Sequence, residues 1–139
     1  MNPQGAARRV TIIVGESDHH NHRPLYAEIV HRAHHAGLAG ASVFRGMEGF
    51  GITSRIHTSR LLSLSQDLPV MILLVDAAEP IERFLREIDD LIGDGLVLVD
   101  DVWVHRPGAP LPAPGDLASG GSTSGGPASG GPASGGPAT

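Results

Sequence analysis

Two residue types are missing from this chain of 139 residues, which contains no cysteine and no lysine. The lack of cysteine excludes disulfides, thiol nucleophiles and thiolate metal ligands. All ten basic residues are arginines, so a Walker lysine, a Schiff-base lysine and a lysine clamp for phosphate are excluded as well. A fixed positive charge that binds an anion must therefore come from arginine.

Positive charge and long apolar segments are also scarce. The formal net charge is −5 and the arginines form no basic cluster, which argues against nucleic acid as the main partner. No apolar run approaches the roughly 20 residues that span a bilayer. Residues 1–9 lack the apolar stretch of a secretory signal. We therefore expect a cytoplasmic protein without direct membrane insertion.

The composition changes after Arg106. Residues 107–139 are rich in glycine and proline and end in Ser-Gly-Gly-Pro-Ala repeats with almost no apolar side chains, so we expect a disordered tail. We expect residues 1–7 to be a flexible N-terminus. Residues 8–106 then form one small domain, whose thin core would gain from oligomerisation.

Within this domain, strand-like and helix-like patterns alternate. Helical spacing of apolar residues follows Pro24 and stops at Gly37, and a broad apolar helix face follows Pro80. The polar residues 16–23 are expected to be a loop, and residues 46–60 a long excursion between strands. Four apolar runs are typical of strands, namely residues 10–14, 41–44, 70–75 and 96–104.

The resulting order is βαββαβ. It predicts an α+β protein of the ferredoxin-like class, with a four-stranded antiparallel sheet and both helices on one face. However, residues 70–75 are apolar at every position, which is typical of a strand whose sheet is covered on both sides. A second copy of the chain is the simplest cover for the face that the helices leave open, so we expect a homo-oligomer.

Six short motifs stand out along the domain: Gly15–Asp18, Pro24–Tyr26, Gly37–Ala41, Arg45–Gly51, Arg55–Thr58 and Asp67–Val70. Together they resemble those of a known family, the bacterial domain of unknown function 190, which belongs to the PII-like superfamily. The resemblance extends over residues 10–104. It implies a trimer with ligand clefts between subunits, and it places residues 46–60 where PII proteins carry the T-loop, which reports a bound nucleotide or metabolite to a partner.

Two features of PII proteins are absent. PII proteins hold nucleotide phosphates with lysines, and this chain has none, so arginine would have to replace them. The turn Gly93–Gly95 stands where PII proteins have a basic phosphate loop, and Asp94 in it would repel phosphate. The resemblance still implies a small anionic ligand, with an adenine nucleotide as the possible cofactor.

We expect the ligand contacts at the ends of the first two strands and in the excursion that follows. Glycines there would allow positive φ and close approach to a ligand, and arginines would hold an anion through paired hydrogen bonds. Alternatively, the glycines only shape the loop, Arg45 and Arg55 pair with Glu48 or Asp67, and Ser17 or Asp18 caps a turn. The predicted ligand-binding residues are Gly15, Glu16, Arg45, Gly46, Glu48, Gly49, Phe50, Gly51, Arg55 and His57.

Two other functions compete with this interpretation. His31 and His35 are four residues apart on a predicted helix and permit a shared metal ion, so the alternative is a trimeric protein that handles divalent metals. Glu48 and His57 form the only pair in the excursion suited to acid–base chemistry. Because no serine there has a nucleophile-elbow motif, we expect no enzyme. The leading hypothesis is a PII-like regulator that binds a protein target, such as a membrane transporter, through residues 46–60.

Overall fold

The computed structural model describes residues 3–50, 57–58 and 67–115. The main sheet has the order β4-β7-β1-β8, and each neighbouring pair is antiparallel. With two helices, this is the predicted ferredoxin-like βαββαβ fold, and the prediction is confirmed. The main elements are β1 (Gly5–Gly15), α1 (Leu25–His35), β4 (Gly40–Arg45), β7 (Pro69–Asp76), α2 (Ala78–Ile92) and β8 (Leu96–Val104).

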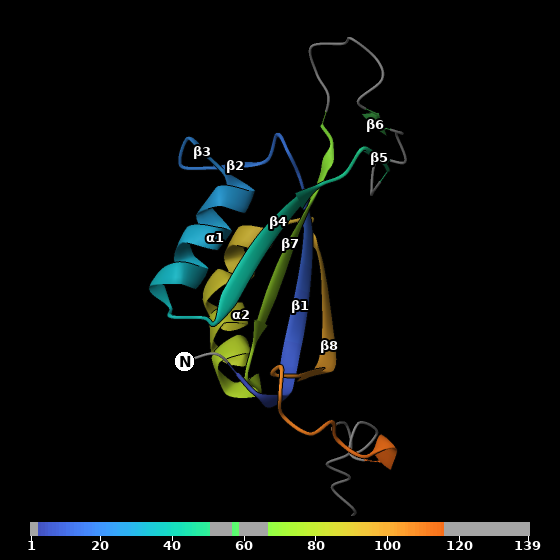
Figure 1. Cartoon of the computed structure of the whole chain (residues 1–139). Helices are drawn as coiled ribbons and strands as arrows, with labels where there is room; N and C mark the ends of the chain where they lie inside the picture. Colours follow the sequence, from blue (N-terminus) through green and yellow to red (C-terminus); the bar gives the residue numbers. More distant parts are fainter. Residues whose placement is uncertain (1–2, 51–56, 59–66, 116–139) are drawn as a thin grey trace, which may run out of the picture.

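Both helices cover the same face of the sheet (Figure 1). In α1 the buried residues recur every four positions, and α2 has one broad apolar face, as predicted. Alternate residues of the two central strands point at these helices, because side chains in a strand alternate between faces. No helix among the described residues is both long and apolar enough to cross a membrane. The core includes Val10, Ile12, Val14, Ile29, Ile72, Leu74, Ile81, Phe84 and Ile88.

Two predicted boundaries need correction. Strand β1 begins at Gly5 and not at residue 10, because Gly5–Ala7 pair with the end of β8. These residues were expected to belong to a flexible N-terminus.

The expected loop at residues 16–23 contains a small hairpin of β2 (His19–His20) and β3 (Arg23–Pro24). Asn21 and His22 connect the two strands with φ values of 47° and 64°. Two successive positive φ angles are the pattern of a tight two-residue hairpin turn, and asparagine tolerates this backbone region.

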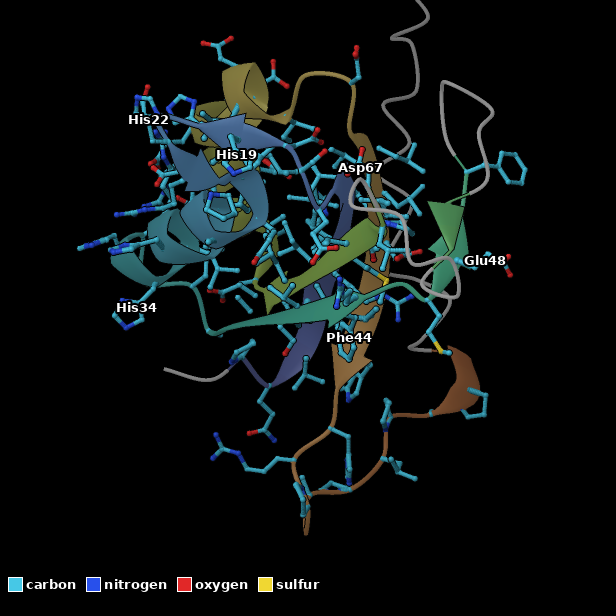
Figure 2. The ribbon with its side chains drawn as sticks, turned by 90° about the horizontal axis from the view of Figure 1, so that it is seen from above. His19, His22, His34, Phe44, Glu48 and Asp67 are labelled. Atoms are coloured by element: carbon cyan, nitrogen blue, oxygen red, sulfur yellow. The ribbon has the colours of Figure 1, made fainter. Side chains whose placement is uncertain are left out.

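On the face of the sheet away from the helices, an ion pair and an apolar band lie in different rows of the strand register. Arg9 Nε lies 3.1 Å from Asp100 Oδ2, and the next pair along the same face, Ala7 and Val102, is apolar again. Nearer the ends of β1 and β4, the register aligns four apolar residues across all four strands. Figure 2 shows one of them, Phe44, on the side of the sheet away from the helices. We call these four the apolar row: Phe44, Met71, Ile13 and Leu96.

The apolar row is incompletely covered in the single chain. Phe44 is 50% exposed and Leu96 is 53% exposed. In the next row of the same face, Leu98 is 47% exposed. Isolated exposed apolar residues are common, but a contiguous band across a whole sheet is typical of an interaction surface.

Candidate functional site

The predicted site residues gather at the end of the sheet that carries the apolar row. Strands β1 and β4 end there, at Gly15 and Arg45, and β7 begins there at Pro69. Gly15 pairs with Pro69, and Arg45 pairs with the next residue of β7, Val70. The chain therefore brings together three segments that are far apart in the sequence.

The residues after β1 form a closed turn. The Gly15 N–H donates to Asp18 Oδ2 at 2.8 Å, and the Asp18 N–H donates to the Gly15 carbonyl at 3.2 Å. The Asp18 carbonyl in turn accepts the N–H of Leu25, the first residue of α1, at 2.8 Å. The alternative that Asp18 caps a local turn is thus confirmed, and this turn is joined directly to the start of α1.

The same turn is attached to the segment that leads into β7. The Ser17 N–H donates to Asp67 Oδ1 at 2.9 Å, and the Glu16 N–H donates to the Leu68 carbonyl at 2.8 Å. A Cβ atom at Gly15 would lie 2.6 Å from Asp67 Oδ1, so only glycine allows this carboxylate to come so close. Figure 2 labels Asp67 near this turn. Asp67 was expected only as a partner for an arginine, and its contact with the turn was missed.

Gly46 and Gly49 serve a different steric purpose from the one predicted. Neither has a φ in the left-handed region, so the predicted positive φ is wrong for both. Instead, both backbones cross closely over Pro69. A Cβ at Gly46 would lie 2.6 Å from Pro69 Cγ, and a Cβ at Gly49 would lie 2.9 Å from it. The Gly46 N–H also donates to the Pro69 carbonyl at 2.7 Å.

Arg45 and Glu16 form an ion pair across this end of the sheet. Arg45 Nη2 lies 2.9 Å from Glu16 Oε2, with the arginine side chain 61% exposed and the glutamate 29% exposed. The alternative pairing of Arg45 with Glu48 or Asp67 is wrong. Exposed ion pairs contribute at most about 1 kcal/mol to stability, so another anion could displace Glu16 at little cost.

The remaining predicted residues lie beyond the main sheet. In the ladder of β5 (Glu48–Gly49) and β6 (His57–Thr58), Glu48 is opposite Thr58 and Gly49 is opposite His57. Glu48 and His57 are therefore not cross-strand partners, and the register does not favour an acid–base pair. Figure 2 shows Glu48 pointing away from the sheet.

Phe50 is 73% exposed, as is Met47. Gly51, Arg55 and the side chain of His57 lie outside the described part of the structure. The sequence reasoning had assigned a ligand contact to Phe50 but none to Met47.

Charged residues surround Glu28 in α1. Glu28 accepts hydrogen bonds from Arg32 Nε at 2.9 Å and from Arg23 Nη1 at 3.1 Å. The hydrogen bond from Arg32 holds the pKa of Glu28 below its ordinary value of 4.5, and the charge of Arg23 acts in the same direction. In residues 3–50, 57–58 and 67–115, no three histidine or acidic side chains come together as a metal site.

The sequence matches a family model. The model is that of DUF190, described as "Uncharacterized ACR, COG1993", and it matches residues 7–104. A UPF0166 protein of Aquifex aeolicus is 38% identical over 93 residues, which cover 67% of this chain and 88% of that protein. A UPF0166 protein of Methanocaldococcus jannaschii is 30% identical over 101 residues, which cover 72% of this chain and 93% of that protein.

Solved structures share the fold. One is CPII from Thiomonas intermedia K12, a nitrogen regulatory PII-like protein whose structure was solved with ADP, AMP and bicarbonate bound. It is 21% identical to this chain and superposes with a TM-score of 0.54, and the match covers 73% of this chain and 91% of CPII. A putative PII-like signaling protein from Thermus thermophilus has a TM-score of 0.52 and 17% identity, and the match covers 72% of this chain and 90% of that protein. At these identities the likeness shows a PII-like fold.

Proposed function

The chain belongs to the DUF190 family, and we propose that it is a PII-like signalling protein, a homotrimer that binds an adenine nucleotide between its subunits. In this proposal, residues 46–60 report the bound nucleotide to a protein partner. The PII-like fold supports this role, as does the binding of ADP and AMP by CPII. The role is regulatory and not catalytic, in line with the register that separates Glu48 from His57.

The position of the apolar row supports clefts between subunits. The row adjoins the strand ends Gly15 and Arg45, whereas the Arg9–Asp100 ion pair lies two rows further along the same face. A second copy that covers the apolar row would therefore place its own residues beside the candidate site. The ligand would then lie between two chains.

The observation that carries the proposal is the exposed guanidinium of Arg45, which is held by Glu16 at this edge. An arginine fork matches two phosphate oxygens, and the bonds it makes to a charged acceptor are about twice as strong as neutral ones. A nucleotide phosphate would displace Glu16 from Arg45. In a chain without lysine, this exchange supplies the cationic phosphate contact that PII proteins obtain from lysine.

The exchange would also affect both ends of the reporting segment. Arg45 immediately precedes Gly46, where the segment leaves the sheet over Pro69. Glu16 belongs to the turn that binds Asp67 and Leu68, where the chain returns to β7. A ligand that prefers Arg45 without Glu16 would thus favour one state of this segment over another.

Isothermal titration of the full chain with ADP, AMP, ATP and cyclic AMP tests the binding site. We expect saturable binding of at least one of these, weakened about tenfold or more by Arg45→Ala, because a hydrogen bond to a charged group contributes about 1.5–3 kcal/mol. Glu16→Gln should strengthen binding, because it removes the competing carboxylate. Arg86→Ala, which changes an exposed arginine of α2, is the matched control and should bind like the wild type. Absence of nucleotide binding, or equal binding by Arg45→Ala, would contradict the proposal.

Hydrogen exchange tests the coupling to the partner segment. On addition of a saturating nucleotide identified by titration, peptides covering residues 46–66 should change their exchange rates. The exchange rates of peptides covering α2 should not change, because α2 packs on the face of the sheet opposite the apolar row. If binding is saturable but residues 46–66 exchange at the same rate with and without nucleotide, the signalling part of the proposal fails while nucleotide binding stands.

A further inference from the structure

Two histidine rings on α1 already lie face to face. His31 and His35 are one helical turn apart, with ring centroids 4.8 Å apart and an interplanar angle of 10°. Both residues are exposed. The buried residues Leu25, Ile29 and Ala33 mark the opposite side of the helix, so the two rings face away from the core.

We propose that His31 and His35 form a two-imidazole site for a divalent transition metal ion, namely Zn²⁺, Ni²⁺ or Cu²⁺. Imidazole nitrogen is a preferred ligand of these ions and binds Zn²⁺ at about 2.0–2.1 Å. Residues four apart on a helix are neighbours on its surface, so both side chains can reach one ion across a single turn. In the stacked arrangement the in-plane nitrogen lone pairs of the two rings do not converge, so the rings turn about their Cβ–Cγ bonds when the ion binds. Water completes the coordination, because the described residues offer no third protein ligand.

The charges around the pair favour a cation there. His35 is the last residue of α1, and the C-terminal end of a helix has a partial negative charge that attracts cations. The nearby positive charge of Arg32 is directed at Glu28, with which it forms an ion pair at 2.9 Å. This pairing reduces the repulsion that Arg32 would exert on a metal ion.

The site would stay accessible in the assembled protein. The helices and the apolar row lie on opposite faces of the sheet (Figure 1). Subunits that meet through the apolar row would leave the outer side of α1 in solvent. The metal site therefore does not depend on the nucleotide site or on the trimer.

Calorimetric titration of the untagged full chain with NiCl₂, ZnCl₂ and CuCl₂ tests the site, with MgCl₂ as a negative control. We expect one ion per chain for at least one transition metal. His31→Ala and His35→Ala should each weaken binding about tenfold or more, because each removes one of two ligands. His22→Ala, which changes an exposed histidine of the β2–β3 hairpin, is the matched control and should keep the wild-type affinity.

A second readout locates the ion on the folded helix. The saturating metal should raise the Tm of the wild type and of His22→Ala, but not that of the double variant His31→Ala/His35→Ala, because binding to the folded state alone is stabilising. Paramagnetic Ni²⁺ or Cu²⁺ should broaden the ring signals of His31 and His35 before those of other histidines. An unchanged affinity in the double variant, or a loss of binding in His22→Ala, would overturn the proposal and place the ion at other histidines. Absence of binding by the wild type would overturn it as well.

Discussion

Replacing Leu98 with glutamate should convert the proposed trimer to a monomer in solution. Leu98 lies on the open face of the sheet in the row next to the apolar row, and it is 47% exposed in the single chain. In a trimer joined through this face, the new carboxylate would be buried among apolar side chains, at a cost of several kcal/mol for an unpaired charge. Size-exclusion chromatography with light scattering measures the change, and circular dichroism shows whether the fold persists.

Leu111→Glu is the control for this prediction. Leu111 is 75% exposed and follows β8, outside the sheet. The same change there should leave the trimer intact. A monomeric wild type, or a Leu98→Glu variant that stays trimeric, would contradict the assembly. If nucleotide binds between subunits as proposed, the monomer should also lose this binding although Arg45 is unchanged, because half of each cleft would be missing.

The fold was predictable because periodicity and burial agree along most of the chain. The continuous apolar run of β7 predicted a strand with two dry faces. The structure buries Val70, Ile72 and Leu74 under the helices and leaves Met71 and Leu73 on the open face. Pro24 and Gly37 marked the ends of α1 through the usual preferences at helix termini, and Gly37 does have a positive φ of 74°.

The contacts within the candidate site were not predictable from spacing. Glu16 and Arg45 are 29 residues apart, and Ser17 and Asp67 are 50 residues apart. These pairs depend on which strands are neighbours and where each strand ends, so they follow from the sheet register and not from any local pattern. Local reasoning therefore paired Arg45 with the wrong acids.

The glycines show the same limit. A sequence shows that glycine is present, but not whether the backbone needs a positive φ or needs space. At Gly46 and Gly49 the reason is space, because Pro69 lies against both. The β2–β3 hairpin was missed for a related reason. Its turn residues, Asn21 and His22, lack the glycine that usually marks a tight hairpin turn.

The substitution Gly15→Ala should destabilise the domain by about 2–3 kcal/mol, at the upper end of the usual cost of overpacking. The added Cβ would lie 2.6 Å and 2.8 Å from the two oxygens of Asp67, well inside van der Waals contact. Moving this carboxylate would also remove the acceptor of the Ser17 N–H. Urea denaturation measures the change in the free energy of unfolding. The turn that carries Glu16 would shift, so nucleotide binding should weaken as well.

A control and a double variant decide whether the contact with Asp67 is the cause. Gly40→Ala adds the same atom to β4, where nothing lies within 4 Å, and it should change stability by no more than about 0.5 kcal/mol. In Gly15→Ala/Asp67→Ala the new Cβ no longer meets a carboxylate. The loss of stability in the double variant should therefore be smaller than the sum of the two single losses, by about 1 kcal/mol or more. If the losses of the two single variants simply add in the double variant, Gly15 is needed for a reason other than its contact with Asp67. The link between this turn and the start of β7 would then depend on the backbone hydrogen bond from Glu16 to Leu68.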